Sequence, residues 1–186
     1  MTEALFTQTK TISDASLEDI KYFKDTVGDF EARVTKSGGG VYKDIRKAQV
    51  KEIKHTEFPD ICEAILDLVP IHRPNLFKSN FEVREFNYLM YEQGGHFVKH
   101  KDYLHSNNGD KFANRVYSTI TLIDKSKDLE GGDLLIWNEN GGGGTCTKIE
   151  LEVGETVIFN SAKFHQVTPI IRGTREALVA WIYLRK

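Results

Sequence analysis

Apolar residues recur at the spacing of helices in the first third of the chain and at the spacing of strands in the rest. One helix is predicted by apolar residues that lie three or four positions apart, namely Leu17, Ile20, Phe23 and Val27. It follows Ser16-Leu-Glu-Asp19, which resembles a capping box with aspartate in the acidic position. Residues 60–69 predict a second amphipathic helix, and Pro70 predicts its end.

The chain after Phe81 consists of short runs rich in β-branched and aromatic residues, separated by turn signals such as Asn108-Gly109 and Gly154. Many short strands with this punctuation predict a sandwich or jelly roll, with the helices packed as support outside one sheet. The glycine run 141–144 is predicted as the tip of a long hairpin. Residues 103–114 are predicted as a loop, either a specificity loop or a plain exposed connection.

Two histidines and one carboxylate form the first candidate site: His100, Asp102 and His165. In a strand, positions i and i+2 point to the same face, so His100 and Asp102 can converge on one metal ion. A third ligand from a distant strand completes one face of an octahedron and leaves three positions for substrates. This is the 2-His-1-carboxylate arrangement of non-haem Fe(II) oxygenases. Because H-x-D arises often by chance, this pair alone is weak evidence for a metal site.

Arg175 stands ten residues after His165 (175 − 165) and begins a run that is apolar on both faces. Such a run is expected of a strand buried on both sides. An arginine that faces this interior needs an anionic partner, because an unpaired buried charge is costly. A dicarboxylate cosubstrate would supply one through bidentate hydrogen bonds. The alternative is that Arg175 only starts the strand and extends its charge into water.

The motifs in the second half of the chain resemble those of one enzyme family. Residues 91–102, Tyr-Glu-Gln-Gly-Gly-His-Phe-Val-Lys-His-Lys-Asp, resemble the Y-x-x-G-x-x-[YF]-x-x-H-x-D pattern of prolyl-4-hydroxylase-like Fe(II)/2-oxoglutarate-dependent dioxygenases. Residues 165–175, followed by Trp181, are similar to their H-x-V-x-P-V-x-x-G-x-R…W signature. Residues 130–134 match the family's Gly-Gly strand opening. The resemblance runs from about residue 81 to the C-terminus.

The resemblance implies a mainly β fold with supporting N-terminal helices (α+β), built on a double-stranded β-helix, or jelly roll. It implies that His100, Asp102 and His165 bind Fe(II), that Arg175 binds the distal carboxylate of 2-oxoglutarate, and that Tyr91 lines the cosubstrate pocket. The expected cofactors are Fe(II), 2-oxoglutarate as cosubstrate and O2, with ascorbate as an accessory reductant. The implied reaction is hydroxylation of a peptidyl residue, with proline as the first candidate, and release of succinate and CO2.

One position departs from the family pattern. The run 115–123 is similar to the family's central strand, where a tyrosine often stands at the position that is Leu122 here. If that tyrosine helps the arginine to hold the carboxylate, another donor is needed in this chain. Tyr91 and Ser118 are the candidates, because Ser118 lies on the same strand face as Leu122.

Composition is consistent with a single enzyme domain over residues 1–186, with residues 1–80 as mostly helical support and residues 81–186 as the jelly-roll core. The net charge of −2 gives no basis for a polyanion-binding surface. The two cysteines, Cys62 and Cys146, are too few for a disulfide framework and lack metal-site spacing. The N-terminus lacks a signal-like pattern and no stretch is long enough to span a membrane, so the sequence predicts a cytoplasmic protein.

Three other functions compete with peptidyl hydroxylation. The first is oxidation of a free amino acid or another small molecule. The second is nucleic-acid demethylation, but that branch of the superfamily carries a second arginine where this chain has Trp181, and no nucleic-acid partner is expected. The third is a non-catalytic metal-binding barrel that acts as a sensor. The presence of all three metal ligands and Arg175 argues against it. No feature of the sequence indicates whether the protein is a monomer or an oligomer.

Overall fold

The computed structural model describes residues 5–26, 30–31, 44–103, 115–138 and 144–185. Val27, most of the predicted loop at 103–114 and most of the predicted hairpin tip at 141–144 lie outside the described residues. No helix within the described ranges is long and apolar enough to cross a membrane.

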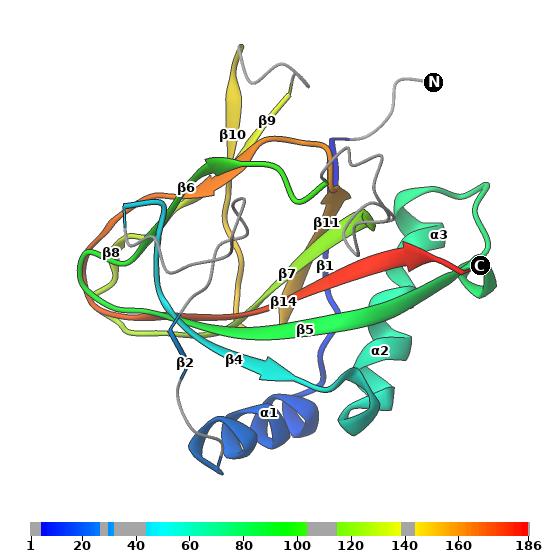
Figure 1. Cartoon of the computed structure of the whole chain (residues 1–186), viewed down its shortest axis with the longest axis horizontal. Helices are drawn as coiled ribbons and strands as arrows, with labels where there is room; N and C mark the ends of the chain where they lie inside the picture. The colour runs from blue at the N-terminus through cyan, green and yellow to red at the C-terminus, as the bar shows by residue number, and fades with distance from the viewer. Residues whose placement is uncertain (1–4, 27–29, 32–43, 104–114, 139–143, 186) are drawn as a thin grey trace.

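Two antiparallel sheets form the body of the protein (Figure 1). The major sheet contains, in spatial order, β1 (Phe6–Lys10), β11 (Glu155–Asn160), β7 (Arg115–Lys125), β14 (Arg175–Leu184), β5 (Phe81–Tyr91), β4 (Gln49–Ile53) and β2 (Phe30–Glu31). The minor sheet contains β10 (Cys146–Ile149), β9 (Leu134–Trp137), β12 (His165–Val167), β6 (His96–His100) and β3 (Arg46–Lys47). A short ribbon pairs β13 (Ile170–Arg172) with β8 (Glu130–Gly131). The predicted mainly β architecture is confirmed, and the first 80 residues add strands β1 to β4 that were not predicted.

The major sheet is covered on both faces, and this explains why β14 is apolar throughout. Its residues Leu178, Ala180 and Ile182 pack in a core that also contains helix residues. Its alternate residues Val179 and Trp181 pack in a second core shared with the minor sheet. Because side chains alternate along a strand, the interior between the two sheets is reached by every second residue of β14. Any functional group on that register therefore faces the barrel interior.

The helices lie on the outer side of the major sheet: α1 (Asp14–Thr26), η1 (His55–Glu57), α2 (Pro59–Leu66), α3 (Leu68–His72) and η2 (Lys78–Asn80). The predicted cap at Ser16 is wrong, because Ser13 occupies that position. The Ser13 Oγ accepts a hydrogen bond from the backbone N–H of Ser16 at 3.1 Å. Pro70 does not end a helix. It lies in the first turn of α3, where a backbone N–H has no partner within the helix.

The two glycines in residues 130–134, which the sequence predicted at the start of a strand, lie in a tight turn before β9. Gly131 and Gly132 have φ angles of 78° and 68°, in the region that favours glycine. A Cβ on Gly131 would lie 2.2 Å from the carbonyl oxygen of Pro169, which no side chain tolerates. A Cβ on Gly132 would lie 3.6 Å from Cδ of Arg175. Gly131 therefore lets the backbone pass directly against Pro169, and Gly132 lies in ordinary contact range of the Arg175 side chain.

Candidate metal centre and anion pocket

Strand pairing in the minor sheet brings His100 and His165 side by side. His100 ends β6 and His165 begins β12, and the two residues are direct partners in the antiparallel ladder. Asp102 is not on the strand with His100, as the i, i+2 argument assumed, but in a bend beyond the end of β6. Its backbone N–H and that of Tyr103 donate to the carbonyl oxygen of Ser161 at 3.1 and 3.0 Å. The bend, not the pleat of a strand, turns the carboxylate toward the two imidazoles.

The three side chains form a compact donor set. The Nε2 atom of His100 lies 3.5 Å from Oδ1 of Asp102, and the Nε2 atom of His165 lies 3.4 Å from Oδ2. One ligand atom from each residue lies within 4.8 Å of the others. These separations suit three donors on one face of a single ion, because ligands about 2 Å from a metal are a few Å apart. Among the described residues, this is the group of histidine and acidic side chains with metal-binding geometry.

Backbone carbonyls fix the tautomer of both histidines. Nδ1 of His100 is 2.8 Å from the carbonyl oxygen of Val98, and Nδ1 of His165 is 3.1 Å from that of Lys163. A carbonyl can only accept, so each Nδ1 carries the proton and donates. Each Nε2 is then left with a lone pair directed at the centre of the donor set, as metal-binding histidines require.

The protonation states of the donor set also fit a divalent cation. Burial alone would raise the pKa of Asp102, but the imidazoles of His165 and His100 and the Ser118 hydroxyl hold that pKa well below its usual range. Burial and the neighbouring His100 lower the pKa of His165 to about 4, against the opposing effects of Asp102 and the Lys163 carbonyl. The set therefore presents an anionic carboxylate and a neutral buried imidazole at neutral pH. Such ligands bind a metal without first losing a proton.

One serine holds the Asp102 carboxylate in place, and a second serine contacts the first. Ser118 on β7 donates to Oδ2 of Asp102 at 2.6 Å, and its hydroxyl also lies 2.9 Å from that of Ser161. Both serines are fully buried. Ser118 was one of the two candidates to replace the missing family tyrosine, but its hydroxyl is engaged with the carboxylate. Tyr91 is thus the remaining candidate.

Arg175 is a buried cation that has no counter-ion among the described residues. Its side chain is 5% exposed, so it does not extend into water. Within the described residues, no hydrogen bond or ion pair reaches its guanidinium, and its Cζ lies 5.9 Å from the centre of the Tyr91 ring. Burial lowers its pKa, partly offset by Tyr91 and Asp133. Among the described buried atoms without a hydrogen-bond partner, none belongs to Arg175, so its guanidinium nitrogens keep some contact with solvent.

The register places Tyr91 beside this cation and Leu122 opposite Ala177, two positions further along β14. Tyr91 pairs with Arg175 across β5 and β14, and it is 1% exposed. Leu122 on β7 pairs with Ala177 and is buried in the core between the two sheets. The family's tyrosine position is therefore apolar here. The phenol of Tyr91 is the neighbouring group that can supply a hydrogen bond to an anion held by Arg175.

A second buried arginine was not predicted. Arg115 begins β7, and its Cζ lies 3.9 Å from the centre of the Trp181 ring. Its Nε donates to the Tyr183 hydroxyl at 2.8 Å, and it forms an ion pair with Glu85. Trp181 pairs with Ser118, so this group lies on the same register as the donor set. An arginine at the head of an apolar strand, the signal that identified Arg175, is also present at Arg115.

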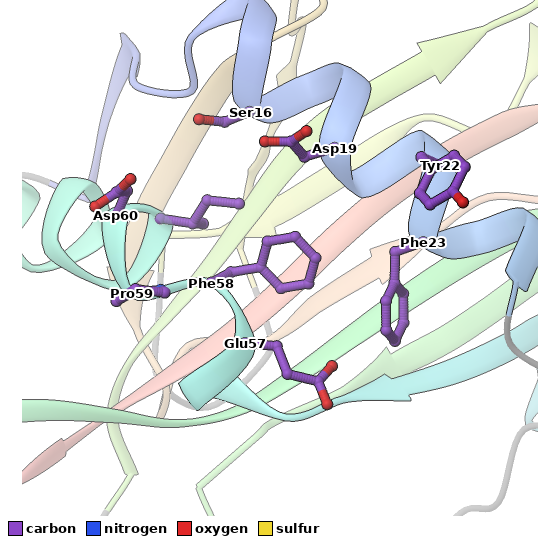
Figure 2. Close-up of a pocket in the computed structure, with 9 residues that line it drawn as sticks. Ser16, Asp19, Tyr22, Phe23, Glu57, Phe58, Pro59 and Asp60 are labelled. Atoms are coloured by element: carbon purple, nitrogen blue, oxygen red, sulfur yellow. The ribbon is translucent and has the colours of Figure 1, made fainter.

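The outer side of the helices carries a separate pocket of about 360 Å³ between α1 and the segment η1–α2 (Figure 2). Phe23 and Phe58 meet edge to face across it, with ring centres 5.6 Å apart. Its other lining residues are Ser16, Asp19, Tyr22, Glu57, Pro59, Asp60 and Ile61. The pocket contains none of the predicted site residues, and the metal-binding geometry lies between the sheets instead.

The chain is similar to known oxygenases in sequence and in structure. Residues 86–183, more than half of the chain, match the sequence model of the 2OG-Fe(II) oxygenase superfamily. A PKHD-type hydroxylase of Paraburkholderia xenovorans is 29% identical over 166 residues, which are 85% of this chain and 69% of that protein. The match to a PKHD-type hydroxylase of Cupriavidus metallidurans is 35% identical over 95 residues, which are 50% of this chain and only 40% of that protein.

Two solved structures have the same fold. A prolyl-4-hydroxylase from Pseudomonas putida has a TM-score of 0.69 at 21% identity, over 97% of this chain and 93% of that one. A prolyl hydroxylase from Trichoplax adhaerens, solved with a peptide fragment of a hypoxia inducible factor degradation domain, has a TM-score of 0.66 at 18% identity. The match covers 96% of this chain and 83% of the second protein. These similarities confirm the predicted jelly roll.

Proposed function

Because the chain belongs to the 2OG-Fe(II) oxygenase superfamily, and is therefore an oxidoreductase that uses Fe(II), 2-oxoglutarate and O2, we propose that it hydroxylates a peptidyl residue, with proline as the first candidate. The reaction would release succinate and CO2. Family membership confirms the predicted enzyme class and these cofactors. The peptide substrate is supported by the likeness to prolyl hydroxylases, one of them solved with a bound peptide.

We assign His100, Asp102 and His165 as the Fe(II) ligands and Arg175 as the residue that binds the far carboxylate of 2-oxoglutarate. One observation carries the assignment: a compact His–Asp–His set faces the same interior between the two sheets as a buried arginine that no described residue pairs. A buried guanidinium that has no protein anion is compensated when a dicarboxylate enters. Tyr91, beside Arg175, is assigned to the wall of the same pocket.

Iron, when bound, supplies the activation of O2 that couples oxidation of 2-oxoglutarate to oxidation of the substrate. The chain's own residues do the positioning. Asp102 contributes the negative charge, and Ser118 keeps one carboxylate oxygen in a fixed orientation. Arg175 orients the cosubstrate from its far end. The apolar side chains of Leu122 and Leu134, both buried between the sheets, exclude water from the interior.

The proposal is tested by anaerobic binding of Fe(II) and 2-oxoglutarate, followed by oxygen exposure with and without a pool of proline-containing peptides. Peptide-stimulated succinate together with a mass gain of one oxygen on a peptide is the expected result. Succinate that free amino acids stimulate, but peptides do not, would redirect the assignment to small molecules. Failure to bind 2-oxoglutarate would contradict the role of Arg175. The Asp102→Ala variant serves as the matched control without turnover.

A further inference from the structure

Within the part of the chain that the structure describes, Arg46 is a second buried cation without an ionic partner. It lies on β3, pairs with Phe97 on β6 and is 8% exposed. Among the described residues, no side chain or carbonyl forms a hydrogen bond or ion pair with its guanidinium. Asp44, the nearest carboxylate along the chain, is exposed and does not pair with it. This resembles the situation of Arg175, but on the opposite sheet.

Arg46 lies next to the candidate iron ligands. Its Cζ is 4.8 Å from the centre of the Phe97 ring. That ring stacks on the imidazole of His100, with centres 3.5 Å apart and planes inclined by 20°. Phe97 packs against the core between the two sheets, so its ring faces the interior. A single aromatic ring thus separates the Arg46 guanidinium from a ligand of the metal.

The exposed end of the guanidinium is suited to a carboxylate. Nε of Arg46 has neither solvent contact nor a hydrogen-bond partner. The two terminal nitrogens differ from it, because they keep some contact with solvent. The terminal nitrogens therefore border accessible space and can donate as a planar fork. A buried, unpaired cation destabilises the protein on its own. An anion that arrives from outside would remove this cost.

We propose that Arg46 determines substrate specificity by binding a carboxylate that lies close to the hydroxylated carbon of the substrate. The inference rests on the proposed hydroxylase function and adds an acidic feature to its substrate class. Two sources would present this chemistry. One is an aspartate or glutamate side chain beside the target residue of a peptide, and the other is the α-carboxylate of a free amino acid. Arg175 and Arg46 would then hold the anions of cosubstrate and substrate respectively.

Thermal unfolding tests the proposal without turnover. Arg46→Met keeps the length and apolar stem of the side chain but removes the charge. Its melting temperature should be at least that of the native protein, because the unpaired cation is gone. An acidic peptide pool should raise the melting temperature of the native protein by about 2 °C or more, as ligand binding to the folded state requires. The same pool should not shift Arg46→Met. A large loss of stability in Arg46→Met would give Arg46 a structural role and overturn the proposal.

Substrate competition tests the specificity directly. Three peptide pools share a central proline and differ only in flanking residues, which are Asp/Glu, Asn/Gln or Lys/Arg. The native enzyme should hydroxylate the acidic pool at least about 10-fold faster than its amide counterpart, as expected for loss of a charge-assisted pair. Arg46→Gln should abolish the preference, and Arg46→Glu should shift it toward the basic pool. Arg172→Gln, which removes an exposed arginine near Asp128 and Glu130, is the charge control.

Free proline and prolinamide form the second arm and separate the two sources. Preference for free proline over its amide, lost in Arg46→Gln, would identify the α-carboxylate as the ligand. Equal use of acidic and amide compounds in both arms would overturn the inference while leaving the hydroxylase function intact. A rise in KM for 2-oxoglutarate in Arg46→Gln, measured without substrate, would assign Arg46 to the cosubstrate and also overturn it. Absence of hydroxylation in every pool and of any thermal shift would contradict both proposals.

Discussion

Ser118, in the major sheet, donates a 2.6 Å hydrogen bond to Asp102, which lies just beyond a strand of the minor sheet. Asp102 follows β6 of the minor sheet, and Ser118 lies within β7 of the major sheet. Through this hydrogen bond, a residue of the major sheet fixes the position of one oxygen of the carboxylate. The other oxygen lies 3.5 Å from Nε2 of His100. The orientation of the carboxylate therefore depends on a residue that would not itself touch the metal.

Replacement of Ser118 by alanine should weaken metal binding without removing a ligand. Loss of a hydrogen bond to a metal-binding carboxylate typically costs about 10–100-fold in affinity. We expect that decrease for Fe(II), or for Mn(II) as an air-stable substitute, measured by calorimetry. Thr119→Ser is the matched control, because Thr119 bonds to the Ala180 carbonyl and not to Asp102. An unchanged affinity in Ser118→Ala would show that the hydroxyl does not support the ligand.

Asp102→Ala should abolish hydroxylation and metal binding together. The variant removes the one anionic donor and leaves two neutral imidazoles, which bind a divalent cation much more weakly. Asp102→Asn keeps the shape and should also lose most of the metal. Metal content by mass spectrometry and succinate yield measure the two effects. Normal turnover in Asp102→Ala would refute the assigned triad.

Arg175→Lys should impair 2-oxoglutarate binding more than catalysis. Lysine keeps the charge but loses the planar fork that binds a carboxylate through two parallel bonds. We expect KM for 2-oxoglutarate to rise by about 10-fold or more, equivalent to about 1.4 kcal/mol, with a smaller change in kcat. Arg175→Met should remain folded, since it removes an unpaired buried charge. If neither variant changes KM, the arginine does not hold the cosubstrate.

The two cysteines should differ in reactivity with pH. Burial, with the charge of Glu63, raises the pKa of the Cys62 thiol to about 11, whereas Cys146 is exposed. Alkylation by iodoacetamide at pH 8, followed by peptide mass spectrometry, should modify Cys146 well before Cys62. Because its folded-state pKa is raised, Cys62 favours folding below pH 9 and loses that contribution between about pH 9 and 11. Cys62→Ala should flatten the stability curve over that interval, and Cys146→Ala should not.

The candidate ligands could be predicted because their spacing is a property of the chain itself. His100 and Asp102 are two residues apart, and the His165–Arg175 interval matches a signature. The local backbone geometry was not predicted correctly, since Asp102 approaches His100 through a bend and not along a strand. The helix cap at Ser13 and the turn that contains Pro70 show the same difficulty. In each case several neighbouring residues fit the local rule, and tertiary packing selects one.

The contacts of the supporting residues could not be predicted, because their partners are distant in the sequence. Ser118 contacts Ser161, 43 positions away, only after β7 and β11 have paired. Arg46 approaches Phe97 only when β3 joins the edge of β6. Single-sequence patterns show which face of a strand is buried. They do not show which strand lies opposite, so hydrogen bonds and stacking between strands become visible only in the folded structure.

The pairing of Asp102 with Ser118 has a mechanical consequence. His100 and His165 belong to the minor sheet, while the carboxylate between them is tethered to the major sheet. A metal ion held by all three would act as a clasp that fastens one wall of the barrel to the other. At a free metal concentration 100 times the Kd, such a clasp adds about 2.7 kcal/mol to the folded state. Stripping the ion should loosen the minor sheet first, which hydrogen exchange would detect as faster opening of β6 and β12 than of β14.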